Sequence, residues 1–215
     1  MAKQIIPKLP YYYDEPFADS SAIPTSLVSE VARQKVKVAL SADAGDEIFA
    51  GYGTYVAALK NLRRVERIPS LFQKGVNMFG ACLSMHSHFG RKVRVASKVM
   101  SLTNKARPAA ILQEIAAHME QENVRRLFKV TYKDVKTTFD NDEWFHDDLS
   151  TIQAIHYQSY LVDDILTKVD RATMSVSLEG REPLLDHRLI EYVAQLPTEF
   201  KFAGCSPKRI LKDIV

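Results

Sequence analysis

The sequence has 215 residues, of which 46% are hydrophobic and 26% are charged. This is the composition of an average soluble globular domain, and the length suffices for one domain with a sizeable core or for a large piece of one. The net charge of +3 comes from scattered basic residues, whereas a nucleic-acid-binding surface needs a dense basic stripe, so we expect no nucleic-acid partner.

The sequence predicts neither a membrane-spanning helix nor an export signal. No apolar run approaches the roughly 20 residues that a membrane-spanning helix needs, and the N-terminus lacks the apolar core of a signal peptide. The two cysteines, Cys82 and Cys205, lie far apart and match no metal-binding spacing, which favours free thiols in a reducing compartment. We therefore expect a cytoplasmic protein.

The first fifty residues predict a loop, a helix and a strand. Residues 1–23 are rich in proline, tyrosine and acidic residues and are interpreted as a loop. Pro24 stands where a helix can begin, and apolar residues follow at helical spacing to about Gln34. The β-branched run 36–40 predicts a strand. Because ligands bind beyond the carboxyl ends of parallel strands, the acidic loop 41–47 lies where a ligand is expected.

From residue 52 onward the pattern is almost wholly helical. Helices are predicted at 52–65, 69–85, 90–101, 107–118, 121–128, 131–139, 147–166 and 187–195. One strand cannot form a sheet, so partner strands either lie upstream of Met1 or are short and carry no clear signature. The predicted fold class is α/β, predominantly helical, with an incomplete parallel sheet.

The loop after the strand carries three carboxylates within five residues, Asp43, Asp46 and Glu47. Carboxylates so close repel one another unless a cation is present, and Mg²⁺ is commonly held by one or two carboxylates together with substrate phosphates. The loop could therefore hold Mg²⁺ on a nucleotide. The alternative is structural: Asp43 or Asp46 caps the following helix, and Glu47 favours its first turn.

Four blocks of the sequence, taken in order, resemble the synthetase domain of glutamine-dependent asparagine synthetases and of their relative β-lactam synthetase. Residues 41–52 (SADAGDEIFAGY) resemble the motif Ser-Gly-(Glu/Asp)-Gly-x-Asp-Glu-x-x-x-Gly-Tyr of that family. The block 13–24 resembles the stretch that precedes this motif. The blocks 178–187 (LEGREPLLDH) and 207–212 (PKRILK) resemble two later blocks of the family.

The resemblance implies a fold and a reaction. Members bind ATP in an α/β domain of the ATP pyrophosphatase type, which is like that of the adenine-nucleotide alpha-hydrolases. They adenylate the side-chain carboxylate of aspartate, and ammonia then displaces AMP to leave an amide. The ammonia comes from glutamine, which a separate N-terminal glutaminase domain hydrolyses. The implied cofactors are therefore ATP and Mg²⁺.

The resemblance also assigns roles to individual positions. Asp46 matches an acid that contacts Mg²⁺ on the pyrophosphate, and Asp43 matches a proton acceptor for the attacking amine. Lys208 matches a lysine that stabilises charge on the adenylated carboxylate, a task that suits a compact ammonium group. The positions that match backbone lying against the nucleotide are Ser41, Ala42 and Gly45.

Further residues of the shared blocks have a structural interpretation beside a functional one. For three of them we favour the structural one: Glu179 and Arg181 are expected to form an ion pair, and Asp186 is expected to cap the helix that begins near His187. Four residues line the substrate pocket or only brace it: Asp14, Glu15, Asp170 and Arg171.

The sequence departs from the family pattern in three respects. The phosphate-binding loop Ser-Gly-Gly-x-Asp-Ser is absent, and so is the N-terminal cysteine of the glutaminase. Two motif glycines are replaced by Ala42 and Ala44, whose methyl groups crowd the nucleotide or disfavour a positive φ. We therefore expect residues 1–215 to be part of one asparagine synthetase domain, without the upstream loop and glutaminase, and inactive alone.

Two other functions stay open. The chain is either a non-catalytic scaffold descended from such an enzyme, or it belongs to an enzyme that amidates a different carboxylate, such as a sugar acid. The missing strands would leave an apolar face exposed, so self-association, for instance as a homodimer, is a further expectation.

Overall fold

The computed structural model describes residues 2–68, 96–97, 99–100, 102, 107–117, 126–127, 147–204 and 206–214. The chain divides into two compact units, one formed by Met1–Gly51 and His156–Val215 and the other by Tyr52–Ile155. The predicted helices 69–85 and 131–139 lie outside the described residues, as do both cysteines, and so does most of 90–101 and 121–128.

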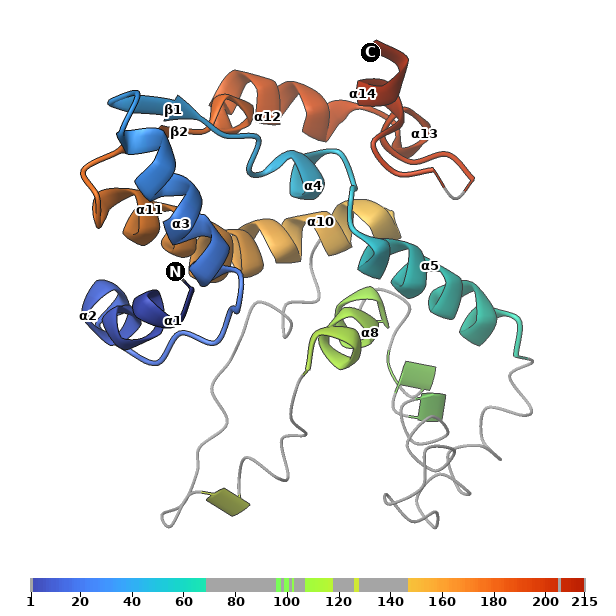
Figure 1. Cartoon of the computed structure of the whole chain (residues 1–215). Helices are drawn as coiled ribbons and strands as arrows, with labels where there is room; N and C mark the ends of the chain where they lie inside the picture. Colours follow the sequence, from blue (N-terminus) through green and yellow to red (C-terminus); the bar gives the residue numbers. More distant parts are fainter. Residues whose placement is uncertain are drawn as a thin grey trace. The chain divides into compact units, whose positions relative to one another are not determined.

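The described elements are mostly helices, with two short strands (Figure 1). In chain order they are α1 (Ala2–Ile5), the 3₁₀-helix η1 (Ile6–Lys8), α2 (Leu9–Tyr13), α3 (Ala22–Arg33), β1 (Val38–Leu40), α4 (Gly45–Ile48), α5 (Gly53–Glu66), α8 (Arg107–Ala116), α10 (Asp148–Gln158), the π-helix η3 (Leu161–Leu166), α11 (Thr167–Met174), β2 (Glu179–Arg181), the 3₁₀-helix η4 (Pro183–Leu185), α12 (His187–Gln195), α13 (Thr198–Lys201) and α14 (Arg209–Ile214). No helix in this part of the chain is both long and apolar enough to cross a membrane.

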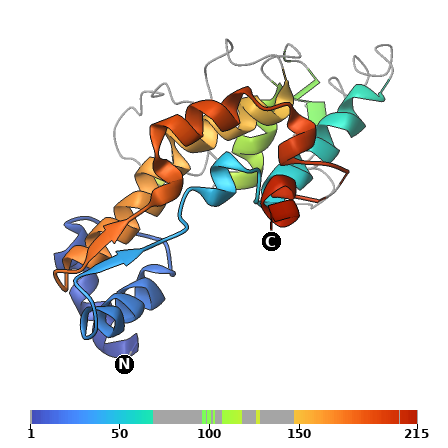
Figure 2. The same cartoon turned by 90° about the horizontal axis from the view of Figure 1, so that it is seen from above.

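The two strands form a parallel pair, which Figure 2 shows side by side. Ala39 lies opposite Gly180, and the pairing ends where Ser41 N–H donates to Arg181 O at 2.9 Å. The strand predicted at 36–40 is confirmed over 38–40, whereas β2 was missed. Glu-Gly-Arg has little intrinsic preference for a strand, so the pairing with β1 decides its conformation.

Helix α3 packs against α11 through small residues (Figure 1). Ala22, Ser26 and Ser29 are buried, whereas Val28 and Val31 are exposed. The buried hydroxyls are satisfied within the helix, since Ser26 Oγ donates to Ala22 O at 2.8 Å. The predicted helix is confirmed, but its most apolar face is not its buried face. Because Val36, Val38 and Leu40 are also exposed, α3 and β1 carry the exposed apolar surface that was predicted.

The core of the first unit lies beneath the acidic loop. Ala44, Ile48 and Phe49, in and beside α4, form a buried cluster with Leu161 of η3 and Val193 of α12. This cluster anchors a helix of only four residues, which would not be stable in isolation.

The second unit contains α5 packed against α8. The buried stripe of α5 consists of Tyr55, Ala58, Leu62 and Val65, which have helical spacing, and the predicted helices 52–65 and 107–118 are both confirmed.

Two predicted boundaries need correction. Residues 2–13 are not a loop but three short helical segments. Pro7 and Pro10 stand in the first turns of η1 and α2, where the missing N–H of proline costs no hydrogen bond, and burial of Ile5 anchors the segment. The helix predicted at 147–166 exists but passes into a π-helix over Leu161–Leu166 and continues through α11.

The orientation of α3 can be tested with two variants of one helix. We expect Ala22→Leu to lower the free energy of unfolding by about 1–3 kcal/mol, because a larger side chain must fit a fully buried position. Val31→Ser should change it by less than about 0.5 kcal/mol, as is usual at exposed positions. Urea denaturation of the 215-residue chain measures both. A large effect of Val31→Ser with none from Ala22→Leu would mean that α3 packs through its other face.

Candidate functional site

The acidic loop begins at the carboxyl end of β1 and leads into α4. Ser41 Oγ donates to the carboxylate of Asp43, and the first-turn position of α4 places Asp46 and Glu47 where the helix dipole favours negative charge. The N-cap of α4 is Ala44, and no side chain caps it. The interpretation of Asp43 as a helix cap is therefore wrong, because its carboxylate is turned back to Ser41.

Asp46 and Lys208 form an ion pair, although they lie far apart in the sequence. Lys208 Nζ is 2.8 Å from Asp46 Oδ1, and the two side chains are 35% and 39% exposed. The backbone also fixes the lysine, since Lys208 N–H donates to Phe49 O at 3.1 Å. The structure thus brings together two residues that were assigned separate roles from the sequence.

The backbone around this ion pair is strained at three positions. Ala44, Ala50 and Lys208 have φ values of 71°, 56° and 54°, in the left-handed region that costs a non-glycine residue about 1–2 kcal/mol. Ala44 therefore adopts the positive φ that its methyl group disfavours. Ala42 has no positive φ, so alanine carries no such penalty there. Strain of this kind clusters at binding sites.

The three carboxylates of the loop do not converge. Asp43 is bonded to Ser41 and Asp46 is paired with Lys208, whereas Glu47 is buried at 2% exposure. Neighbouring residues of a helix point about 100° apart, which separates Asp46 from Glu47. Within the described ranges, no group of three or more His, Cys, Asp or Glu side chains could hold a metal ion. Asp43 and Asp46 are both partly exposed, whereas the buried Glu47 is not accessible to a cation.

Two of the three residues whose backbone is predicted to lie against a nucleotide already use their N–H groups in hydrogen bonds within the protein. Ser41 N–H is used in the strand pairing, and Gly45 N–H donates to Ala42 O at 3.2 Å. Gly45 also packs against Leu184, so that an added Cβ would lie 3.0 Å from its Cδ1. Ala42 is exposed and is the most accessible of the three.

Glu182 was not singled out from the sequence, yet it lies at the same edge of the sheet. Burial raises its pKa, and the negative charge of Asp43 raises it further. Glu182 directly follows β2, so the rule that ligands bind at the carboxyl ends of strands would have identified it had that strand been recognised. The structural roles predicted nearby are confirmed: Glu179 pairs with Arg181, and Asp186 caps α12 by accepting from Arg188 N–H at 2.9 Å.

The predicted substrate residues lie on two segments of the first unit. Arg171 of α11 approaches Asp14 at 3.4 Å, and both side chains are largely exposed. Asp14 and Glu15 line a cavity of about 450 Å³ together with apolar residues that include Ile6 and Phe17. Asp14 and Arg171 are thus brought together, and whether they contact a substrate stays a prediction.

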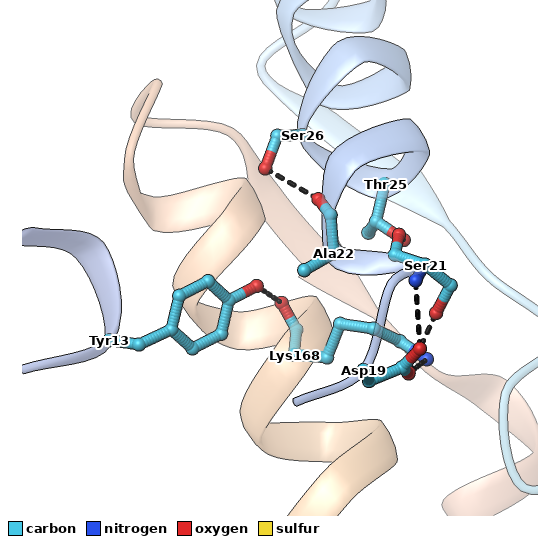
Figure 3. Close-up of polar contacts among 7 residues, drawn as sticks. All are labelled: Tyr13, Asp19, Ser21, Ala22, Thr25, Ser26 and Lys168. Carbon is cyan, nitrogen blue, oxygen red and sulfur yellow. Dashed lines mark hydrogen bonds and ion pairs between the residues drawn. The ribbon is translucent and has the colours of Figure 1, made fainter. Parts of the chain in front are cut away.

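A partly buried ion pair holds these two segments to each other (Figure 3). Lys168 Nζ of α11 donates to Asp19 Oδ2 at 2.6 Å, and Asp19 also accepts from Ser21 N–H and Ser21 Oγ. Tyr13 O–H donates to Lys168 O at 3.2 Å, and its ring stacks on Phe17. Tyr13 is 4% exposed and is therefore a packing residue, whereas Tyr11 is 84% exposed.

At this ion pair the pKa values of two neighbouring carboxyl groups are shifted in opposite directions. Although burial opposes it, hydrogen bonds from Lys168 and Ser21 lower the pKa of Asp19 to about 2. Burial first, and then the charge of Asp19, raise the pKa of Asp164. Asp19 is therefore the ionised partner of Lys168, and Asp164 keeps its proton to higher pH.

Fold and site together describe an α/β protein whose polar groups gather at the carboxyl ends of two parallel strands. The chain belongs to the asparagine synthase family, whose model matches residues 1–215.

Curated relatives resemble nearly the whole chain. Asparagine synthetase (glutamine-hydrolysing) 1 of Bacillus subtilis is 30% identical over 214 residues, which are 96% of this chain and 32% of that protein. A Mycobacterium tuberculosis protein, named for the same synthetase, is 29% identical over 216 residues, 96% of this chain and 31% of its own length. The chain thus spans about a third of the length of these relatives. No solved structure matches it.

The Lys168–Asp19 pair predicts a pH-dependent effect of Asp19→Asn. Because the pKa of Asp19 is lower in the folded chain than its ordinary value of 3.8, its ionised form stabilises the fold above about pH 4 and loses this effect as the pH falls towards 2. We expect Asp19→Asn to lower the free energy of unfolding by roughly 2–3 kcal/mol at pH 7 and by much less at pH 2. Urea denaturation at several pH values measures this difference. An effect that is equal at both pH values would show that the charge of Asp19 is not what stabilises the contact.

Proposed function

We propose that this chain is the part of a glutamine-dependent asparagine synthetase that carries the acidic loop and the reacting lysine. In this reaction the side-chain carboxylate of aspartate attacks the α-phosphorus of ATP and pyrophosphate leaves. Ammonia then attacks the adenylated carboxyl carbon, and AMP leaves to give asparagine. The observation that carries the proposal is the ion pair between Asp46, in the helix that follows β1, and Lys208.

Lys208 is proposed to stabilise negative charge on the adenylated carboxylate during the attack of ammonia. Its ammonium group is only partly exposed, and both its backbone and its side chain are held by the loop segment 46–49. A charge held in place before the reaction stabilises a transition state without further reorganisation. Asp43 is proposed to accept the proton that the attacking amine loses, a role for a carboxylate at the same edge of the sheet.

Asp46 is the residue proposed to hold Mg²⁺. When bound, the ion would neutralise charge on the pyrophosphate leaving group. The backbone of Ser41, Ala42 and Gly45 is proposed to lie against the ATP, with the exposed Ala42 as the closest approach.

The proposed partners are aspartate and ammonia derived from glutamine by a separate glutaminase domain. Asp14 and Glu15 at the cavity, with Asp170 and Arg171 on α11, are the proposed substrate residues. Another carboxylate, such as a sugar acid, is the alternative acceptor, and a non-catalytic scaffold is the alternative function.

The intact mass of the native protein and a product assay test this proposal together. A native mass well above 24.3 kDa is expected. This native full-length protein should form asparagine and AMP in equal amounts from aspartate, ATP, Mg²⁺ and ammonia. The 215-residue chain alone should release no AMP. AMP release from the chain alone would contradict its expected inactivity. A full-length product that neither binds ATP nor forms AMP would favour the scaffold.

A matched pair of lysine variants in the native full-length protein tests the role of Lys208. We expect Lys208→Met to lower kcat at least about 100-fold, because a preorganised charge at the reacting centre is removed, with little change in the KM for aspartate. Lys212→Met serves as control, since Lys212 is exposed on α14 and its side chain donates to Ser206 Oγ at 3.3 Å, away from Asp46. Equal effects of the two substitutions would refute a specific role for Lys208.

A further inference from the structure

Gly51 lies directly against the Asp46–Lys208 ion pair. A Cβ atom added at this position would lie 2.7 Å from Asp46 Cγ and still closer to Asp46 Oδ1 and Lys208 Cε. Non-bonded carbon atoms are normally about 3.5–4.0 Å apart. The space that a side chain of residue 51 would need is therefore occupied by the ion pair itself.

The backbone conformation of residue 51 does not by itself require a glycine. Its φ lies outside the left-handed region, whereas the neighbouring Ala50 is within it. Gly51 N–H donates to Asp46 O at 2.7 Å, a bond that any residue except proline could make. An alanine could thus adopt this backbone, and only the missing methyl group distinguishes the glycine.

We propose that Gly51 is a positioning residue, whose lack of a side chain allows the Lys208 ammonium to reach Asp46 at the edge of the sheet. That this placement serves catalysis rests on the proposed function, whereas the placement itself does not. Gly51 acts through Lys208 and need not contact a substrate.

The expected response to a larger residue is local. The atoms nearest to the added methyl group belong to the ends of two flexible side chains, and both are partly exposed. They can rotate away into solvent, so that Gly51→Ala separates the ion pair while the chain stays folded. Gly53 is the matched control, because it is also a glycine of this segment and an added Cβ there meets no atom of the described residues within 4 Å.

The amine reactivity of Lys208 reports its position without any assay of activity. An ammonium group held against a carboxylate acetylates more slowly than a free one, because the contact must open before the amine can reach the reagent. With acetic anhydride and mass spectrometry, the acetylation rate of Lys208 relative to the exposed Lys35 should rise about two- to fivefold in Gly51→Ala, as expected for loss of a partly exposed pair. Asp46→Asn should give the same rise and Gly53→Ala none.

Kinetics of the native full-length protein then test whether the position of Lys208 matters for the reaction. Gly51→Ala should lower kcat about 10- to 100-fold, the usual effect of displacing a reacting group by about 1 Å, and leave the KM for aspartate nearly unchanged. Gly53→Ala should leave both constants unchanged. If the unsubstituted protein makes no asparagine, the proposed function fails, and the acetylation ratio still decides the role of Gly51.

The double variant Gly51→Ala/Asp46→Ala covers the case in which Gly51→Ala does not fold. Removing the Asp46 carboxylate removes one overlap and frees the Lys208 side chain to move away from the new methyl group, so the double variant should fold and acetylate at Lys208 as fast as Asp46→Ala alone. Failure of the double variant to fold, or a folded Gly51→Ala with an unchanged acetylation ratio, would overturn the proposal.

Discussion

The pairing of β1 with β2 is the constraint on which the candidate site depends. It joins two segments from opposite ends of the chain in a parallel arrangement, so that their carboxyl ends meet at one edge. Ser41 and Asp43 follow the first strand, and Glu182 follows the second. Three residues in each strand make few hydrogen bonds, so the pair relies on the packing of the elements that flank it. Among these, α11 contacts both α3 and β2.

Polar side chains are buried where α3 and the segment that precedes it pack against α11. Ser26 and Ser29 are buried in α3, and Lys168 of α11 is buried with its ammonium on Asp19. A buried charge is tolerated only when paired, and removal of one partner leaves the other unsatisfied. The carbonyl of Lys168 also accepts from Tyr13 O–H, so this one residue joins α11 both to α2 and to the segment before α3.

The site combines local strain with long-range anchoring. Ala44, Ala50 and Lys208 adopt a left-handed backbone without being glycine, and such conformations persist only where the surrounding structure enforces them. Here the buried cluster around Ile48 and Phe49 supplies that enforcement. The loop is thereby held in one shape, which a site that must place a lysine beside a carboxylate requires.

By itself the sequence determined what is encoded locally or in motifs. Periodicity predicted α3, α5, α8 and α12, β-branched residues predicted β1, and the motif blocks indicated the family and the residues Asp46 and Lys208. The tertiary structure alone decided which partners meet. It paired β2, whose Glu-Gly-Arg sequence has no strand preference, with β1. It turned the small face of α3 inward, separated Asp46 from Glu47, and placed Lys208 and Gly51 against Asp46. Most of these contacts join residues distant in sequence, and local propensity carries no information about them.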